Sequence, residues 1–284
     1  MWSLLRTLKE KEAVRNKISI KKGESLVSEV QRDEACVWLC EVAAKEKFGL
    51  DTLCLAVAVL DEILSISRVQ SKYLNCVALA SLYMAVKLCE ELESIPDCVQ
   101  WLVRLNASYS APELMRMERA ILSKLGWDLG LPTVHRFLQL MMPVCGIRCE
   151  GRLEWSLWSA VCTLLPSHRV VYNYPPSVCA LAVLSLALET QQLSSWFSVM
   201  AALEQLFKLD QSELIACREQ LGCLLYKEKD KENVSLVAAG FVAKKPGKRA
   251  RKRQRRSSRS SESGLPQKVM GVEDIADALM VLYG

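Results

Sequence analysis

The chain has 284 residues, of which 51% are hydrophobic and 24% are charged, so it has enough apolar material for one large or two ordinary domains. Its longest apolar stretches, residues 73–86 and 177–188, are shorter than the roughly 20 residues of a membrane span, and we expect neither a span nor a signal peptide. The formal net charge of +5 arises from ten basic residues in the range 244–259, so residues 1–243 are slightly acidic and the basic character belongs to a tail.

The first half of the chain predicts a short N-terminal helix followed by five closely spaced helices. Residues 2–16 place apolar side chains among charged ones, which is typical of an amphipathic helix. The patterns that begin at residues 53 and 72 are apolar nearly all round and are therefore predicted to be buried. We expect caps at Asp51-Thr52 and at Ser94. The expected helices cover residues 2–16, 29–48, 53–64, 72–91 and 94–105, and a further one begins at Ser110.

The helix that begins at Ser110 has the clearest start signal in the chain. Ser110 and Glu113 form a Ser-x-x-Glu capping box, and Pro112 suits the first turn. Glu118 then falls among apolar residues that share one face, where an unpaired carboxylate is costly to desolvate. We therefore expect Glu118 either to face solvent or to have a partner, and we favour a partner from another protein.

The second half repeats this plan more loosely, again with an apolar helix in the middle. Its helical patterns cover residues 132–140, 154–165, 178–190, 194–206 and 210–226. Strand-like alternation, paired glycine turns and phosphate-binding glycine loops are absent from the sequence. The sequence therefore predicts an all-α protein with two five-helix lobes in tandem. Its expected parts are 1–28 (N-terminal helix and linker), 29–130 (first lobe), 131–226 (second lobe) and 227–284 (tail).

The tail is predicted to be mostly disordered, because it has few apolar groups to bury and a dense run of like charge. A short amphipathic segment is expected over residues 272–283. The basic run is typical of segments that are read by nuclear import receptors or attracted to nucleic acid or acidic membranes. We favour the import receptor and expect the protein in the nucleus and the cytoplasm; a solvated tail that adds solubility is a further alternative. The residues of this localisation-like segment are Lys244, Lys245, Lys248, Arg249, Arg251, Lys252, Arg253, Arg255 and Arg256.

Several stretches between residues 29 and 226 resemble the cyclins. The second predicted helix carries Gln-Arg-Asp-Glu followed by Trp-Leu, and the third carries Leu-Asp-Glu-Ile-Leu-Ser, similar to a family motif that ends Asp-Arg-Phe-Leu-Ser. Leu-Pro-Thr-Val-His-Arg-Phe-Leu is similar to the entry into the family's second lobe. These motifs begin at Gln31, Leu60 and Leu131. Within the cyclins, the sequence resembles the I type most closely and the G type next.

This resemblance implies the two-lobe cyclin fold and a regulatory subunit that binds a cyclin-dependent serine/threonine kinase. In the family, a lysine and a glutamate at the positions of Lys87 and Glu118 bond the kinase beside its mobile regulatory helix. Both bonds are charge-assisted, because an ammonium donates to carbonyls and a carboxylate accepts from N–H groups. Apolar residues around them pack against the kinase helix, which binding holds inward. The matching apolar positions are Met84, Leu88, Leu122, Trp127 and Leu129.

Two further sets of residues follow from the same resemblance. Arg32 and Asp61 match a buried ion pair that ties the first helix of the family's first lobe to the second, and we interpret them as structural. Many cyclins also dock substrates on an apolar patch, and here polar or small residues replace part of it, which predicts weak docking of that kind. The positions of this degenerate patch are Gln31, Glu34, Ala35, Trp38, Glu41, Leu74 and Asn75.

The sequence does not predict an enzyme. His135 and His168 are its only histidines; we expect a helix-surface and a loop histidine, without a nucleophile motif beside them. The twelve cysteines favour a reducing compartment, and with so few histidines we expect no metal site and no cofactor. Two alternatives to a kinase regulator stay open. One is a cyclin-fold transcription or nucleic-acid adaptor, for which lobes that are slightly acidic are unfavourable, and the other is a kinase-free scaffold.

Overall fold

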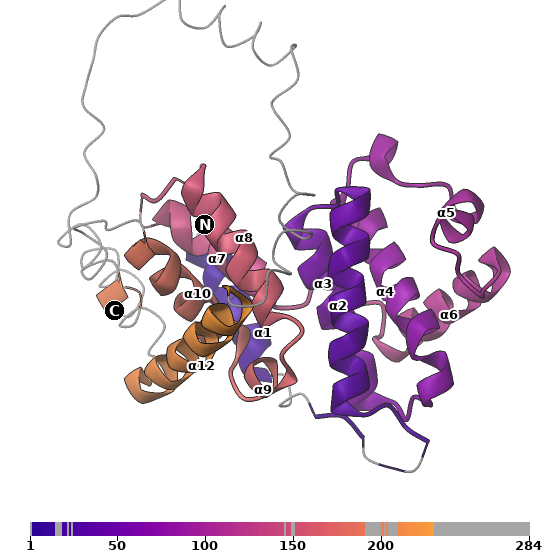
Figure 1. The fold of residues 1–284 in the computed structure, drawn as a ribbon, viewed down its shortest axis with the longest axis horizontal. Helices are drawn as coiled ribbons and strands as arrows, with labels where there is room; N and C mark the ends of the chain where they lie inside the picture. Colours follow the sequence, from indigo (N-terminus) through magenta and orange to yellow (C-terminus); the bar gives the residue numbers. More distant parts are fainter. Residues whose placement is uncertain are drawn as a thin grey trace, which may run out of the picture.

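A computed structural model shows the protein as two helical lobes side by side (Figure 1). The structure describes residues 2–14, 19–21, 23, 25–144, 146–148, 151–190, 200–201, 203 and 210–229. Within these residues the secondary structure is helical, apart from an isolated bridge between Leu26 and Gln70. The predicted all-α class is confirmed. None of the described helices is long and apolar enough to cross a membrane.

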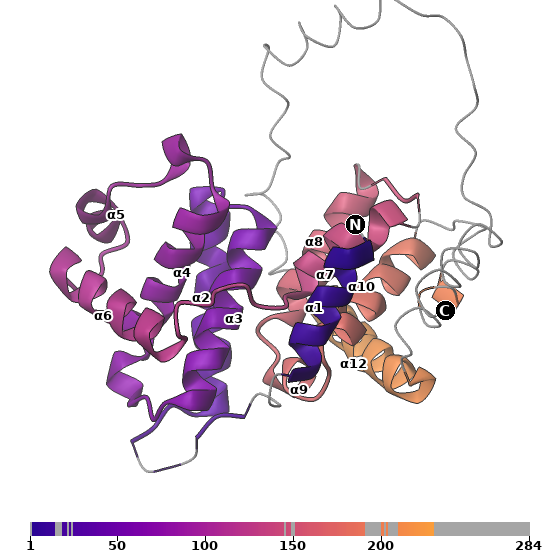
Figure 2. The ribbon, with the colours of Figure 1, turned by 180° about the vertical axis from the view of Figure 1, so that it is seen from behind.

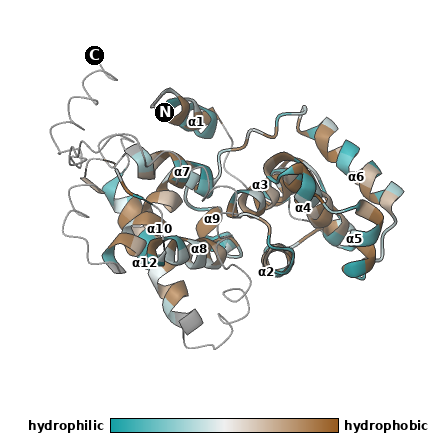
Figure 3. Cartoon of the chain, turned by 90° about the horizontal axis from the view of Figure 1, so that it is seen from above, coloured by the Kyte–Doolittle hydropathy of each residue, from teal (hydrophilic) through white to brown (hydrophobic). Residues whose placement is uncertain are grey.

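The first lobe contains the five α-helices that the sequence predicts, together with two short 3₁₀ helices. The α-helices are α2 (Glu29–Glu46), α3 (Leu50–Ile66), α4 (Leu74–Cys89), α5 (Cys98–Arg104) and α6 (Ala111–Lys124), and the 3₁₀ helices are η1 (Ser71–Tyr73) and η2 (Leu92–Ser94). Helices α3 and α4 pack against each other at the centre, and both are largely buried, as their apolar composition predicts. The more polar α5 and α6 lie at the outer edge of this lobe (Figure 3).

The N-terminal caps of the helices agree with the sequence expectation at α6 and differ from it at α3 and α5. The capping box of α6 is present, because the Glu113 carboxylate accepts from the Ser110 N–H at 2.8 Å. The Ser110 hydroxyl also donates to Glu113, at 2.7 Å, and the two hydrogen bonds from Ser110 lower the pKa of the Glu113 carboxyl. Two expected caps are wrong: Asp97, not Ser94, caps α5, and α3 begins at Leu50, before Asp51-Thr52.

The start of α3 is held by a residue from another helix end. The Glu90 carboxylate, which follows α4, accepts from the Gly49 N–H at 2.6 Å and from the Thr52 hydroxyl at 2.7 Å. A carboxylate at a helix N-terminus satisfies free N–H groups and interacts favourably with the helix dipole. Glu90, about 40 positions away in the chain, therefore caps the N-terminus of α3 in place of a local residue.

The second lobe is built around a buried central helix, as predicted, but includes a short helix that the sequence does not signal. Its described helices are α7 (Val134–Val144), α8 (Arg152–Leu164), α9 (His168–Val171), α10 (Pro176–Thr190) and α12 (Gln211–Lys229). Helix α10 packs against α7, α8, α9 and α12. The helix expected over residues 194–206 falls largely outside the described residues.

The N-terminal helix α1 (Trp2–Val14) is present as predicted and packs on the second lobe, although the first lobe follows it in sequence (Figure 2). Leu5 and Leu8 are buried, and α1 contacts α7. Polar bonds fix its register, since the Lys9 ammonium donates to the Ser177 hydroxyl at 2.8 Å and the Glu12 carboxylate accepts from the Ser177 N–H at 2.7 Å. The second lobe is therefore assembled from both ends of the described chain.

Candidate functional site

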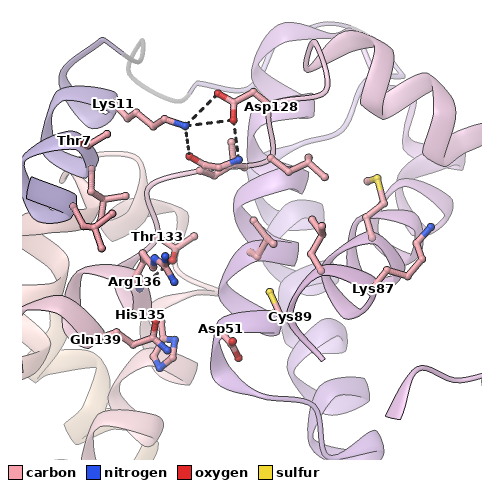
Figure 4. A pocket seen from close by; sticks show the side chains of 18 of the residues that line it. Thr7, Lys11, Asp51, Lys87, Cys89, Asp128, Thr133, His135, Arg136 and Gln139 are labelled. Carbon is pink, nitrogen blue, oxygen red and sulfur yellow. Dashed lines mark hydrogen bonds and ion pairs between the residues drawn. The ribbon is translucent and has the colours of Figure 1, made fainter. Parts of the chain in front are cut away.

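A groove of about 830 Å³ lies where the ends of α4 and α6 meet α1, α7 and the connection between the lobes (Figure 4). All seven residues predicted to bind a partner line this groove. They come from three separate segments of the first lobe and its connection: Met84, Lys87, Leu88, Glu118, Leu122, Trp127 and Leu129. The structure therefore brings together residues that the sequence spreads over more than 40 positions.

Lys87 and Glu118 form an ion pair with each other at the edge of the groove. Glu118 therefore has a partner, which is one of the two outcomes expected from the sequence, and in the free chain this partner is the Lys87 ammonium rather than another protein. The ammonium also lies 4.9 Å from the centre of the Tyr83 ring. The two side chains are 36% and 15% exposed, so both charges reach solvent. A partly exposed pair of this kind contributes little to stability and remains open to another partner.

The apolar residues of the groove divide into a buried floor and an exposed edge. Met84 is only 1% exposed, so it shapes the floor and offers little surface. Leu88 and Trp127 are 58% and 70% exposed. Trp127 also has a positive φ of 64°, a conformation that costs a non-glycine residue of order 1 kcal/mol or more. A large aromatic side chain in strained backbone and in solvent is more typical of a binding surface than of a folding core.

The sequence did not predict the second half of the groove, which α1 and the second lobe provide. The Lys11 ammonium reaches from α1 to the connection, where it lies 3.4 Å from the Asp128 carboxylate and 3.3 Å from the Gly130 carbonyl oxygen (Figure 4). The amphipathic pattern of residues 2–16 was visible, but it does not say which lobe the helix covers. The lining residues that these two parts add include Leu4, Thr7, Lys11, Thr133, His135, Arg136, Gln139 and Leu140, and Asp51 of α3 in the first lobe lines the groove as well.

His135 lies on a helix, as expected, whereas His168 begins the short helix α9 instead of lying in a loop. His135 lines the groove at the start of α7, and its Nδ1 is enclosed without a hydrogen-bond partner among the described residues. His168 contacts Asp33 of the first lobe. Cys89, another lining residue, has its pKa raised to about 11 by burial and by nearby Asp51, so its thiol is protonated near neutral pH. The described residues contain no cluster of metal-ligating side chains.

A fall in pH is expected to destabilise the protein through His135. Burial lowers the pKa of His135 from its ordinary value of 6.5, against an opposing effect of Asp51. Between the lowered pKa and 6.5, the unfolded chain binds a proton that the folded chain does not, so the free energy of unfolding falls as the pH falls through this window. Urea unfolding at about pH 7.5 and about pH 5.5 measures the effect. Between these two pH values, the free energy of unfolding should fall less in His135→Leu than in the wild type. An equal fall in both proteins would contradict the role of His135.

Arg32 and Asp61 form a bidentate ion pair between α2 and α3, with distances of 2.7 Å and 2.6 Å and side chains that are 0% and 1% exposed. Burial alone would lower the pKa of Arg32, but the Asp61 carboxylate, together with smaller effects of Cys36 and Tyr172, outweighs burial and raises this pKa. The Arg32 guanidinium also donates to the Leu165 carbonyl oxygen at 2.7 Å, and the Tyr172 hydroxyl donates to Asp61 at 3.1 Å. The pair thus extends into the second lobe, which the sequence does not predict.

The degenerate patch on α2 and α4 offers little apolar surface. Ala35 and Leu74 are buried, and the Gln31 amide is engaged in the capping box of α2 and accepts from the Ser71 hydroxyl at 3.1 Å. Glu34, Glu41 and Asn75 are exposed, and Trp38 is half-buried. The localisation-like segment from Lys244 to Arg256 lies outside the described residues, so its role stays a prediction.

Comparisons with known proteins agree with this architecture. Residues 1–130 match the family model described as cyclin, N-terminal domain, and residues 132–248 match cyclin, C-terminal domain. Cyclin-G1 from Pongo abelii is 31% identical over 183 residues, 62% of this chain and 62% of that protein. Cyclin-I2 from Homo sapiens is 27% identical over 198 residues, 66% of this chain and 53% of that protein. The matched region thus spans less than two thirds of the length of these relatives.

Solved structures share the fold at low sequence identity. A viral cyclin from herpesvirus saimiri superposes with a TM-score of 0.66 at 19% identity, covering 78% of this chain and 97% of the viral chain. A chain of the yeast RNA Pol II CTD kinase complex superposes with a TM-score of 0.51 at 16% identity, covering 92% of this chain and 91% of the other. The tandem two-lobe fold expected from the sequence is therefore confirmed.

Proposed function

Because the chain belongs to the cyclin family, we propose that it is a non-catalytic regulatory subunit that binds a cyclin-dependent serine/threonine kinase through the groove beside Lys87 and Glu118. The resemblance to the I and G types that the sequence indicated is confirmed by the relatives it matches. A similar chain belongs to a yeast kinase complex, which supports a kinase as the partner.

The observation that carries this proposal is the convergence of all seven predicted residues on one groove. Its middle is apolar, and a cation and an anion stand together at its edge. A helix with one apolar face fits such a groove, while the two charges reach backbone groups at its end. Binding of this kind would favour the kinase conformation in which the regulatory helix lies inward, which is a population shift.

The ion pair between Lys87 and Glu118 makes binding an exchange of bonds. In the free chain each charge is satisfied by the other, so the partner must replace an existing bond. Hydrogen bonds to charged groups contribute about 1.5–3 kcal/mol each, and the lost pair offsets part of that gain. We therefore expect these two residues to contribute moderately to affinity and strongly to the orientation of the partner.

A charge swap tests the proposal more sharply than a simple deletion. Lys87→Ala/Glu118→Ala should weaken binding about tenfold, which is about 1.4 kcal/mol. Lys87→Glu/Glu118→Lys keeps an ion pair within the chain but reverses its polarity, so it should weaken binding at least as much. Surface plasmon resonance against a panel of purified cyclin-dependent kinases measures both variants.

The control is a second ion pair of the first lobe, outside the groove. Arg104 and Glu46 lie 2.9 Å apart, and Arg104→Ala/Glu46→Ala should leave kinase binding unchanged. If the charge-swapped protein bound as well as the wild type, the Lys87–Glu118 pair would be merely structural. If the wild type bound none of the kinases, the proposed function would fail.

A further inference from the structure

The two lobes also meet away from the groove, at a junction between α2 and α9. Helices α1 and α2 lie on opposite sides of the molecule (Figure 3), so this junction is on the far side from the groove wall that α1 forms. Three side chains make its outer part: Glu29 and Asp33 from α2, and His168 from α9. We call this set the interlobe clasp.

Asp33 is the centre of the clasp, because one carboxylate serves both lobes. Its Oδ2 lies 2.6 Å from Nδ1 of His168, and since a carboxylate only accepts, the imidazole donates. Its Oδ1 accepts from the His168 backbone N–H at 3.0 Å and from the Arg32 guanidinium at 3.1 Å. The second ring nitrogen of His168 lies 3.5 Å from the Glu29 carboxylate. Both ring nitrogens thus face carboxylates of the first lobe.

The clasp is connected to the groove through packed helices. Helix α9 packs against α10, and α10 packs against α7, which forms the second-lobe wall of the groove. The opposite wall comes from α4 and α6 of the first lobe. Because packed helices move as units, a rotation of the second lobe at the α2–α9 junction would change the separation of these walls.

We propose that Asp33 and His168 are positioning residues for the groove: they fix the second lobe against the first and so keep the groove at the width that its partner requires. This role rests on the proposed function, since it takes the kinase as the occupant of the groove. Asp33 and His168 are 26% and 20% exposed, and the buried Arg32 that donates to Asp33 keeps its two hydrogen bonds to Asp61. Replacing Asp33 or His168 therefore leaves no buried charge unpaired and should leave both lobes folded.

The test measures the relative placement of the lobes and the affinity in the same variants. Spin labels are introduced through bio-orthogonal residues at Val103 on α5 and Glu219 on α12, which are both exposed, because labelling through cysteine is impractical in a chain with 12 of them. His168→Ala should broaden the distance distribution between the labels about twofold. Kinase affinity should fall about threefold, in proportion to the population that keeps the binding geometry.

Two further variants separate positioning from a general loss of structure. His168→Asn should largely restore the narrow distribution and the affinity, because its amide N–H lies close to the position of Nδ1 and still donates to Asp33. Arg169→Ala changes an exposed side chain on the same helix and should behave as the wild type. If His168→Ala does not fold, Asp33→Ala takes its place; it removes both carboxylate oxygens that accept from His168, while Arg32 keeps its hydrogen bonds to Asp61.

Each outcome decides the proposal. The proposal is supported if His168→Ala has a broader distance distribution and weaker kinase binding, and if His168→Asn regains the narrow distribution and the affinity. A distance distribution that does not change overturns it, and so does a broadened distribution with unchanged affinity. Neither of those results affects the proposed function, which fails instead if the wild-type chain binds no kinase, and the positioning role then fails with it.

Discussion

Replacement of Arg32 by alanine should lower the free energy of unfolding by about 3–5 kcal/mol, the largest effect that we expect from any single substitution in the described residues. The cause is the carboxylate that stays behind. Asp61 is 1% exposed and receives two hydrogen bonds from Arg32. Without the Arg32 guanidinium, the Asp61 carboxylate is an unpaired charge in the core. The Leu165 carbonyl oxygen loses a donor as well. Urea unfolding followed by circular dichroism measures the change.

A matched double variant shows whether the stranded charge is the cause. Arg32→Met/Asp61→Leu removes both charges and fills similar volume, so it should cost less than Arg32→Ala alone. Because domains of this kind are stable by only about 5–15 kcal/mol, the single variant should also fold poorly on expression. A loss below about 1 kcal/mol for Arg32→Ala would show that Asp61 finds another partner or becomes neutral, and would contradict the structural role.

Trp127→Ala should weaken kinase binding by about 2 kcal/mol or more, roughly 30-fold, while the stability of the free chain changes by less than about 0.5 kcal/mol. The expectation follows from its position. Trp127 lies on the groove with 70% of its surface exposed, so the fold gains little from its burial, whereas a partner that covers it gains much. Titration calorimetry with the purified kinase measures the affinity.

Because the backbone at Trp127 is left-handed, a glycine at this position should affect kinase binding and the stability of the free chain differently. Trp127→Gly removes the ring and also relieves the positive φ, so it should lose binding while the melting temperature stays level or rises. Trp155 on α8 is 42% exposed and does not line the groove, so Trp155→Ala serves as the control. Full affinity in Trp127→Gly would show that the strained aromatic residue is not an anchor for the kinase.

The sequence predicted the parts of this protein that depend on local pattern. The all-round apolar composition identified the buried helices α3 and α4, and the spacing of Ser110 and Glu113 identified the start of α6. The resemblance to the cyclins supplied the rest, since it selected Lys87 and Glu118 from many surface charges. From the sequence composition alone, Lys87 and Glu118 cannot be told apart from ordinary solvated surface charges.

What the sequence did not predict depends on contacts between residues far apart in the chain. The Glu90 carboxylate that caps α3 and the Asp33 carboxylate that holds α9 have no local signature, because their partners lie about 40 and 135 positions away. The ion pair between Lys87 and Glu118 was missed for another reason: the resemblance describes these residues with a partner bound, and the free chain satisfies them internally. The division of the chain at residue 130 stays a prediction.

The docking of α1 on the second lobe has a consequence for biosynthesis. The bonds from Lys9 and Glu12 to Ser177 span 168 and 165 positions. At roughly 5–20 residues per second, the ribosome exposes α1 about 10–30 s before its docking site is made. During that interval the first lobe can fold, while Leu5 and Leu8 have no surface to bury against. The wall that α1 contributes is therefore the last part of the groove to form, and a nascent chain stalled before Ser177 would display the Lys87–Glu118 edge with that wall missing.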